Sequence, residues 1–249
     1  MQINLKKIGG TDTSDIVCIA FHHVGGSFRE YQWLKDTNCL VYFVELPGRL
    51  GNSNPMHVVD IEISLFEIAK SIAKTFSGKR LVFFGASMGA QLAYRLADEI
   101  SKYDDIFLSS FISASAMCPR RQADHDIKSI IRSDERILDS IAKYMGADIP
   151  DEIKYSDFFS VLVSIIRQDY QLFEQLKAKK FHQLKCPVVS IHGESDGFVT
   201  SQMNIGWADF ALSSFVAHTL EGNHFFTAES RKEICTIIRN QIIQLREAR

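Results

Sequence analysis

The sequence lacks the features that mark several classes of protein. Only 5 of its 249 residues are proline and 14 are glycine, whereas 46% are hydrophobic, so neither a collagen-like nor a disordered chain is indicated. Lysine and arginine total 28 against 30 acidic residues, and the net charge of −2 lacks the basic excess typical of nucleic-acid-binding proteins. We therefore expect a globular protein with no nucleic-acid partner.

Long apolar runs are also absent. The longest stretches without a charged residue, 81–94 and 106–119, have 14 residues each, whereas a membrane-spanning helix needs ~20 apolar residues. Near the start of the chain, the segment 9–15 is polar where a secretory signal would be apolar. The five cysteines are odd in number and lack C-x-x-C spacing, a pattern that favours buried free thiols. We therefore expect a cytoplasmic protein that does not bind membranes.

Short apolar segments alternate with helical patterns along most of the chain. The segments typical of strands are 16–21, 40–46, 81–84, 106–112, 188–192 and 215–220. Apolar residues recur at helical spacing in 64–76, 88–100 and 229–246. This alternation predicts an α/β fold with a mostly parallel sheet that is covered by helices on both faces.

One region shows no strand pattern. From about 120 to 181 the sequence indicates helices, one over 127–145 with Gly146 as its stop and one over 158–176. The first half of the second helix is apolar on nearly every face, so it must be covered or must line an apolar cavity. We interpret the region as a helical lid inserted into a single domain that spans 1–249. A small helical subdomain without a gating role is the alternative.

The segment 85–89 fits the pattern G-x-S-x-G. It follows the predicted strand 81–84 directly, and a helical pattern begins directly after it. A strand, a tight turn and a helix in this order form a nucleophile elbow, which places the serine at the helix N-terminus and at the edge of the sheet. Ser87 is therefore the predicted nucleophile, and an inert serine in a glycine-rich turn is the alternative.

Two late loops offer the base and the acid that a serine nucleophile needs. His224 lies in the turn after the last predicted strand, at the same sheet edge as Ser87, and we assign it as the general base. Asp196 lies in the loop 193–197 after the preceding strand, and we assign it as the acid that orients the imidazole and stabilises the imidazolium. Glu194 is the second choice for this acid.

Two backbone N–H groups are candidates for an oxyanion hole, which stabilises the charge of a tetrahedral intermediate. One belongs to Met88, the residue after the nucleophile. The other belongs to Val24 in the loop 21–27, where Gly25 and Gly26 let the backbone approach a substrate closely. Each such donor is typically worth ~10²–10³ in rate.

Six segments, taken in order, resemble the motifs of one family. They are F-H-H-V-G-G at 21–26, V-E-L-P-G-R at 44–49, F-F-G-A-S-M-G at 83–89, I-R-Q-D-Y at 166–170, G-E-S-D at 193–196 and G-N-H-F-F at 222–226. The family is that of the type II (external, editing) thioesterases of non-ribosomal peptide and polyketide synthesis, which includes the medium-chain acyl thioesterases of fatty acid synthesis. The chain departs from the family pattern at His22, Val24 and Ala86, where the family has proline, alanine and histidine.

This resemblance implies an α/β-hydrolase fold with Ser87 as nucleophile, Asp196 as acid, His224 as base, and Val24 and Met88 as oxyanion donors. It implies hydrolysis of acyl or aminoacyl thioesters held on the phosphopantetheine arm of a synthase carrier domain, through an acyl-serine intermediate and in an editing role. It implies no metal or other cofactor, and it favours a monomer.

The resemblance also suggests where the acyl group binds, because the lid would line its channel. The expected substrate-binding residues are Phe158, Leu162, Ile166 and Phe225. Two alternatives stay open. The protein is an esterase or lipase acting on free oxoesters, since the serine chemistry is shared, or it is a catalytically silent binding protein on a hydrolase scaffold.

Overall fold

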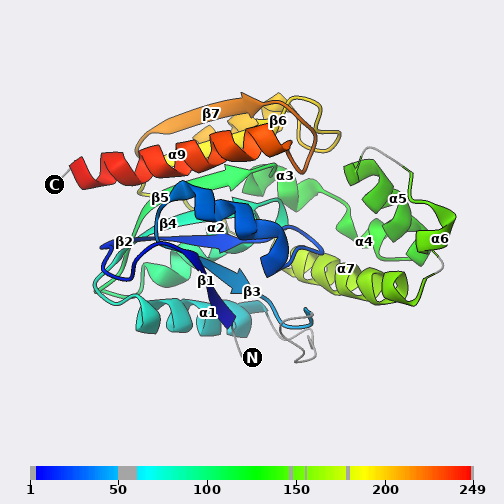
Figure 1. Cartoon of the computed structure of the whole chain (residues 1–249), viewed down its shortest axis with the longest axis horizontal. Helices are drawn as coiled ribbons and strands as arrows, with labels where there is room; N and C mark the ends of the chain where they lie inside the picture. The colour runs from blue at the N-terminus through cyan, green and yellow to red at the C-terminus, as the bar shows by residue number, and fades with distance from the viewer. Residues whose placement is uncertain (1–3, 50–60, 146–147, 155, 178–179, 248–249) are drawn as a thin grey trace.

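The computed structural model describes residues 4–49, 61–145, 148–154, 156–177 and 180–247 of the chain. Within these residues, a seven-stranded sheet has the order β1-β3-β2-β4-β5-β6-β7 (Figure 1). β1 pairs antiparallel with β3, and every other neighbouring pair is parallel. The strands are β1 (Asn4–Gly9), β2 (Ile16–Phe21), β3 (Val41–Glu45), β4 (Arg80–Ala86), β5 (Phe107–Ala114), β6 (Val188–Gly193) and β7 (Phe215–Leu220).

Helices cover both faces of this sheet (Figure 1). The helices α1 and α2 pack on one face, and the 3-10 helix η1 and the C-terminal helix α9 pack on the other. The helical elements are η1 (Phe28–Thr37), α1 (Ile61–Thr75), α2 (Met88–Ile100), α3 (Pro119–Asp124), α4 (Ile127–Ile130), α5 (Asp134–Met145), α6 (Asp151–Lys154), α7 (Asp157–Gln175), α8 (Ser201–Ile205), η2 (Gly206–Phe210) and α9 (Ala228–Glu247).

The interior strand β2 shows how one sheet supports two cores. All six of its residues are buried, because successive side chains point to opposite faces and each face is covered by helices. One face belongs to an apolar cluster with α1 and α2, here called the α2-side core, through Val17, Ile19 and Phe21. The other belongs to a cluster with η1 and α9, here called the α9-side core, through Ile16, Cys18 and Ala20.

The sequence predicted six of the seven strands and missed β1. Its sequence, N-L-K-K-I-G, has adjacent lysines and no alternating apolar pattern. The strand forms because its backbone pairs with β3 at the edge of the sheet, and Lys6 forms an ion pair of 2.5 Å with the buried Glu45. The predicted α/β class, with a mostly parallel sheet, is confirmed.

The helices α3 to α7 lie between β5 and β6 in the chain. In Figure 1, α4 to α7 gather beyond the end of the sheet to which the parallel strands point, on the right of the view. Among them α7 occupies the central position, because α4, α5 and α6 each pack against it. The long helix predicted over 158–176 is thereby confirmed as α7.

The prediction of a single helix over 127–145 is wrong, because the chain turns between α4 and α5. Local side chains cap the two pieces separately. Asp126 accepts a hydrogen bond from the Ser129 N–H at the start of α4, and Ser133 accepts one from the Arg136 N–H at the start of α5. The predicted stop, Gly146, lies outside the described residues.

The structure also bears on the apolar segments and the cysteines considered in the sequence. None of the helices described by the structure is long and apolar enough to cross a membrane. All five cysteines are free and buried, as the sequence predicted.

Candidate active site

The turn between β4 and α2 holds Ser87 in a strained backbone conformation, with φ 52° and ψ −117°. The Ser87 N–H donates a hydrogen bond of 2.8 Å to the carbonyl of Ala114 on β5. Neighbouring chain segments approach so closely that only glycine fits on either side. A Cβ at Gly89 would lie 2.3 Å from the carbonyl oxygen of Phe21, and one at Gly85 would lie 2.4 Å from the Cα of Ala90. The predicted strand–turn–helix arrangement is therefore present.

The loops after β6 and β7 bring Asp196 and His224 into contact. The His224 Nδ1 lies 2.8 Å from Asp196 Oδ2, and the two side chains are 5% and 0% exposed. The other carboxylate oxygen of Asp196 accepts hydrogen bonds from the N–H groups of Phe198 and Val199, at 2.8 and 3.1 Å. Glu194, the second choice for the acid, is exposed. The structure therefore pairs the histidine with Asp196.

These contacts decide the ionisation of Asp196. Burial opposes the charged form, but the hydrogen bond and charge of His224 and the two backbone N–H groups outweigh it, so the pKa of Asp196 lies below its usual value. An ionised Asp196 can only accept, so the His224 ring donates through Nδ1. That leaves Nε2 as the ring atom able to take a proton. His224 and Ser87 line the same cavity.

The loop after β2 presents Val24 to this cavity. Its neighbours on both sides are held by hydrogen bonds, because the His23 N–H donates to the Tyr31 hydroxyl at 3.0 Å and the Gly25 N–H donates to Asp169 at 2.7 Å. Gly25 adopts φ 77°, a conformation that favours glycine. Met88, the second predicted donor, is fully buried at the first position of α2, where a backbone N–H has no partner within the helix.

Two departures from the family motif, His22 and Val24, lie in this loop. Burial lowers the pKa of His22 to about 3, and the Arg49 charge acts in the same direction, so the ring is neutral. Its Nδ1 lies 2.7 Å from the carbonyl of His23 and therefore carries the proton that it donates there. Val24, which replaces alanine, adds a half-buried side chain to the cavity wall.

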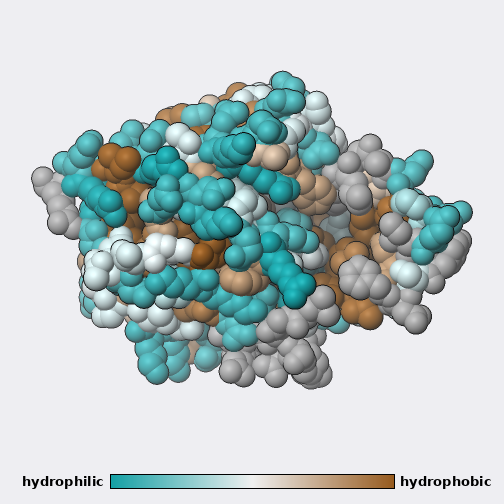
Figure 2. Space-filling model, viewed as in Figure 1, coloured by the Kyte–Doolittle hydropathy of each residue, from teal (hydrophilic) through white to brown (hydrophobic). Residues whose placement is uncertain are grey.

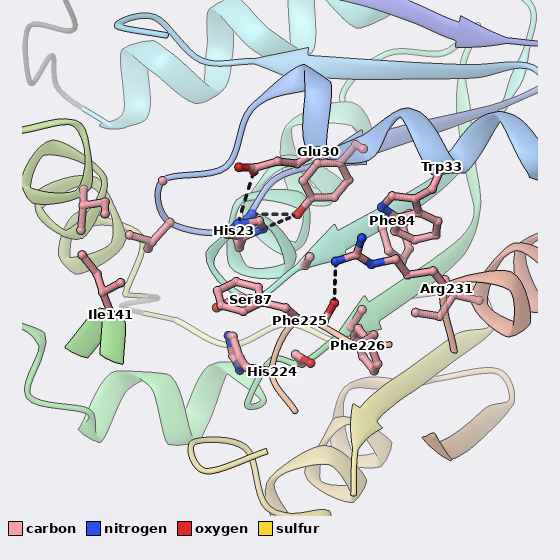
Figure 3. A pocket seen from close by; sticks show the side chains of 18 of the residues that line it. His23, Glu30, Trp33, Phe84, Ser87, Ile141, His224, Phe225, Phe226 and Arg231 are labelled. Carbon is pink, nitrogen blue, oxygen red and sulfur yellow. Dashed lines mark hydrogen bonds and ion pairs between the residues drawn. The ribbon is translucent and has the colours of Figure 1, made fainter. Parts of the chain in front are cut away.

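The cavity has a volume of about 450 Å³ and extends to both sides of Ser87 (Figure 3). On the side of α5 and α7 its walls belong to the α2-side core and come from Val24, Ile141, Leu162, Ile166 and Tyr170. On the opposite side its walls belong to the α9-side core and come from Tyr31, Trp33, Phe84, Ala86, Ala114, Phe226 and Ile234. Figure 2 shows hydrophobic residues at the surface where the body of the molecule meets α4 to α7.

Three of the four predicted substrate-binding residues line this cavity, namely Leu162, Ile166 and Phe225. The fourth, Phe158, falls within α7, but its side chain lies outside the described part of the chain. Sequence reasoning missed the whole α9-side wall. Ala86 was its one visible signal, because a small residue there leaves open the space that the family's histidine would take.

Among the residues that the structure describes, no group of three or more histidine, cysteine, aspartate or glutamate side chains could hold a metal ion.

Fold and site together define an α/β-hydrolase: a mostly parallel sheet, a serine on the elbow after β4, and a histidine–aspartate pair on the loops after β7 and β6. The structure of RedJ, a thioesterase from the prodiginine biosynthetic pathway in Streptomyces coelicolor, matches with a TM-score of 0.81 at 20% identity, covering 94% of this chain and 88% of that one. The structure of BorB, a type II thioesterase from the borrelidin biosynthetic cluster, matches with a TM-score of 0.78 at 23% identity, covering 96% and 95%.

The chain belongs to the thioesterase family, because the model of the Thioesterase domain matches residues 17–242. It is also similar to the protein named linear gramicidin dehydrogenase LgrE of Brevibacillus parabrevis. The two are 23% identical over 241 residues, which cover 93% of this chain and 89% of LgrE. The family relationship predicted from six sequence motifs is thereby confirmed.

The elbow geometry makes the Gly89→Ala substitution costly. The added methyl group would meet the backbone of β2, which cannot rotate away, so we expect the free energy of unfolding in urea to fall by about 3 kcal/mol. The matched control is Gly197→Ala, whose Cβ would meet nothing within 4 Å; a change within about 0.5 kcal/mol is expected there. Equal effects of the two substitutions would contradict the close approach.

The lowered pKa of Asp196 makes its contribution to stability depend on pH. A carboxyl whose native pKa is lowered stabilises the fold at pH values above its unfolded pKa of about 4, and this contribution is lost as the pH falls through the native pKa. We therefore expect the stability difference between the wild type and Asp196→Asn, followed by urea unfolding from pH 7 to pH 3, to persist down to about pH 4 and then to shrink. A difference that grows on acidification would rule out this assignment.

Proposed function

We propose that the protein is a serine thioesterase that hydrolyses acyl or aminoacyl thioesters through an acyl-Ser87 intermediate. The observation that carries the proposal is the His224–Asp196 hydrogen bond of 2.8 Å beside a cavity that Ser87 also lines. Membership of the thioesterase family supports the same chemistry. The dehydrogenase name of LgrE is a statement about that protein, whereas the groups gathered here are suited to acyl transfer to serine.

The proposed reaction has two halves. In the first, His224 Nε2 takes the proton from the Ser87 hydroxyl, whose oxygen attacks the thioester carbonyl carbon. The N–H groups of Met88 and Val24 stabilise the negative oxygen that forms. The carbon–sulfur bond then breaks, the thiol leaves with the proton from His224, and the acyl group stays on Ser87.

In the second half, water replaces the serine. His224 takes a proton from the water as its oxygen attacks the acyl carbon, and the same two N–H groups stabilise the new oxyanion. The bond to the Ser87 oxygen breaks, His224 returns the proton to it, and the free acid departs. Asp196 keeps the imidazole in the orientation and tautomer that both halves require.

The thiol half of the substrate is proposed to be the phosphopantetheine arm of a carrier protein domain. RedJ and BorB, which share the fold, are described as thioesterases of biosynthetic pathways or clusters. We therefore propose that the protein edits misloaded acyl groups on such a synthase. We further propose that it acts as a monomer in the cytoplasm, since five free thiols are typical of a reducing compartment, and that it needs no cofactor.

The helices α3 to α7 are proposed to act as a lid inserted into a single catalytic domain. They are inserted between β5 and β6, and α5 and α7 supply the lid-side wall of the cavity through Ile141, Leu162 and Ile166. An acyl group that lies against this wall would be shielded from water while its carbonyl lies at Ser87.

The proposed activity is tested with an acetyl group radiolabelled on a phosphopantetheinylated carrier protein, with a matched free acetyl oxoester in parallel. We expect fast release from the carrier and slow turnover of the oxoester. Replacing the nucleophile in Ser87→Ala should lower kcat by up to ~10⁶. Scintillation counting of the released acetate measures both rates.

The other outcomes separate the alternatives. Oxoester turnover with an untouched carrier would assign the protein to the esterases and would refute the carrier partner. Turnover of neither substrate, together with no covalent labelling of Ser87 by a serine-reactive phosphonate, would identify a binding protein on a hydrolase scaffold.

The two walls of the cavity predict two different effects on acyl-chain length. Leu162→Trp narrows the lid side and Ala86→Phe narrows the α9 side, since both residues line the cavity. If the acyl group occupies the lid side, Leu162→Trp lowers kcat/KM for long acyl groups about tenfold or more and leaves acetyl release unchanged. Ala86→Phe then leaves the ratio of kcat/KM for long acyl groups to kcat/KM for acetyl unchanged. A chain-length series on one carrier measures it, and the reverse pattern would place the acyl group against the α9 side.

A further inference from the structure

A buried ion pair joins the loop after β3 to the lid helix α7. The Arg49 Nη2 lies 2.6 and 2.5 Å from the two carboxylate oxygens of Asp169, and the two side chains are 2% and 0% exposed. The residues are 120 positions apart in the chain. Charges removed from water in this way are held only where other polar groups satisfy them.

Two of those other polar groups belong to the loop that carries Val24. Asp169 Oδ2 also accepts a hydrogen bond of 2.7 Å from the Gly25 N–H, and the Arg49 Nε donates one of 3.0 Å to the Gly26 carbonyl. A further Arg49 nitrogen donates to the Pro47 carbonyl at 3.3 Å. The pair therefore holds the peptide group between Val24 and Gly25 and the one between Gly26 and Ser27.

The lid helix also touches this loop through an apolar contact. A Cβ added at Gly25 would lie 3.0 Å from Cγ1 of Ile166, a side chain that lines the cavity one turn before Asp169 on α7. On the far side of Val24, the His23 N–H is held by Tyr31. The peptide group that contains the Val24 N–H is held through its other end, the His23 carbonyl, which accepts hydrogen bonds from the Gly26 N–H at 3.0 Å and from the His22 Nδ1 at 2.7 Å. Because Asp169 and Arg49 hold the peptide groups on both sides of the Gly26 N–H, the ion pair helps to set the direction of the Val24 N–H.

We infer that Arg49 and Asp169 are positioning residues that aim the Val24 N–H at the oxyanion and couple the oxyanion hole to the placement of the lid helix α7. This inference rests on the proposed function, because it gives Val24 the role of a donor. Neither Arg49 nor Asp169 lines the cavity in the part of the chain that the structure describes. Their effect on the reaction therefore passes through the backbone of the loop.

Two variants test the inference. Asp169→Asn keeps an oxygen that can accept from the Gly25 N–H but loses the charge that holds Arg49. The double variant Arg49→Met with Asp169→Leu removes both charges together, so that no unpaired buried charge is left to unfold the protein. The matched control is Asp134→Asn. It breaks the ion pair between Asp134 on α5 and Arg167, which lies on α7 like Asp169, and it does not touch the loop.

Three measurements distinguish a positioning role of Arg49 and Asp169 from a role in stability alone. For both test variants we expect kcat to fall by ~10²–10³, the range for loss of one oxyanion donor, with KM changed less than about threefold. Inhibition by an acyl trifluoromethyl ketone, which forms an oxyanion on the serine, should weaken by the same factor as kcat/KM. The dissociation constant of a thioether analogue that lacks the carbonyl should not change, and the Asp134→Asn control should keep all three values.

Two results would overturn the inference. One is a folded double variant, judged by near-ultraviolet circular dichroism, whose kcat and ketone inhibition stay within threefold of the wild type. The other is a parallel loss of kcat, ketone inhibition and thioether binding in proportion to the unfolded fraction. Failure of the proposed function is distinct from both, because the wild type itself would then hydrolyse no carrier-bound thioester.

Discussion

The first turn of α2 packs directly on the carboxyl end of β2, and the arrangement of the site depends on this contact. Gly89 makes it possible, because any side chain there would collide with the Phe21 carbonyl. The contact places the N-terminus of α2, with Ser87 and the Met88 N–H, beside the first residues of the loop that carries Val24. The contact thus brings together two distant segments of the chain that carry the proposed oxyanion donors.

The remaining parts of the site are arranged around that point by parallel strands. Since β4, β6 and β7 run in the same direction, the loops that follow them all open at one edge of the sheet, where Ser87, Asp196 and His224 lie. The buried Asp196 then has one oxygen for His224 and the other for two backbone N–H groups. Such an acid cannot swing away, so the histidine keeps one orientation.

Sequence reasoning succeeded where a local pattern determines the outcome. The apolar runs of β2 and β7 were predicted with their observed ends, and the elbow was recognised because glycines at 85 and 89 are required by local sterics. It failed where the partner is distant. β1 is a strand only because β3 lies beside it, and the turn that divides α4 from α5 depends on two short capping side chains.

The candidate site shows the same contrast between features set by local sequence and features set by distant partners. Asp196 and His224 could be assigned from their places after strands, but the α9-side wall could not, because Trp33, Phe84 and Ile234 come from three elements with no shared motif. The Arg49–Asp169 pair was likewise invisible as a contact, although both residues lie in segments that resemble family motifs. A spacing of 120 residues carries no information about which charges meet.

A cavity that borders two cores suits a substrate with two dissimilar halves. A thioester places an acyl group on one side of its reacting carbon and a thiol arm on the other, and Ser87 lies between the α2-side and α9-side walls. Ala86 lines the cavity on the α9 side, so a larger side chain there would narrow that half.

The buried cysteines have a consequence for an enzyme that handles activated acyl groups. The acyl group of a thioester transfers readily to any accessible thiolate. An acyl group bound to a cysteine in this way would have no base or oxyanion hole nearby to release it. Burial raises the pKa of Cys18, Cys39, Cys186 and Cys235, and all five thiols are shut away from solvent. The protein is in this sense protected against transthioesterification by its own substrate, and the hydroxyl of Ser87 is left as the proposed acceptor.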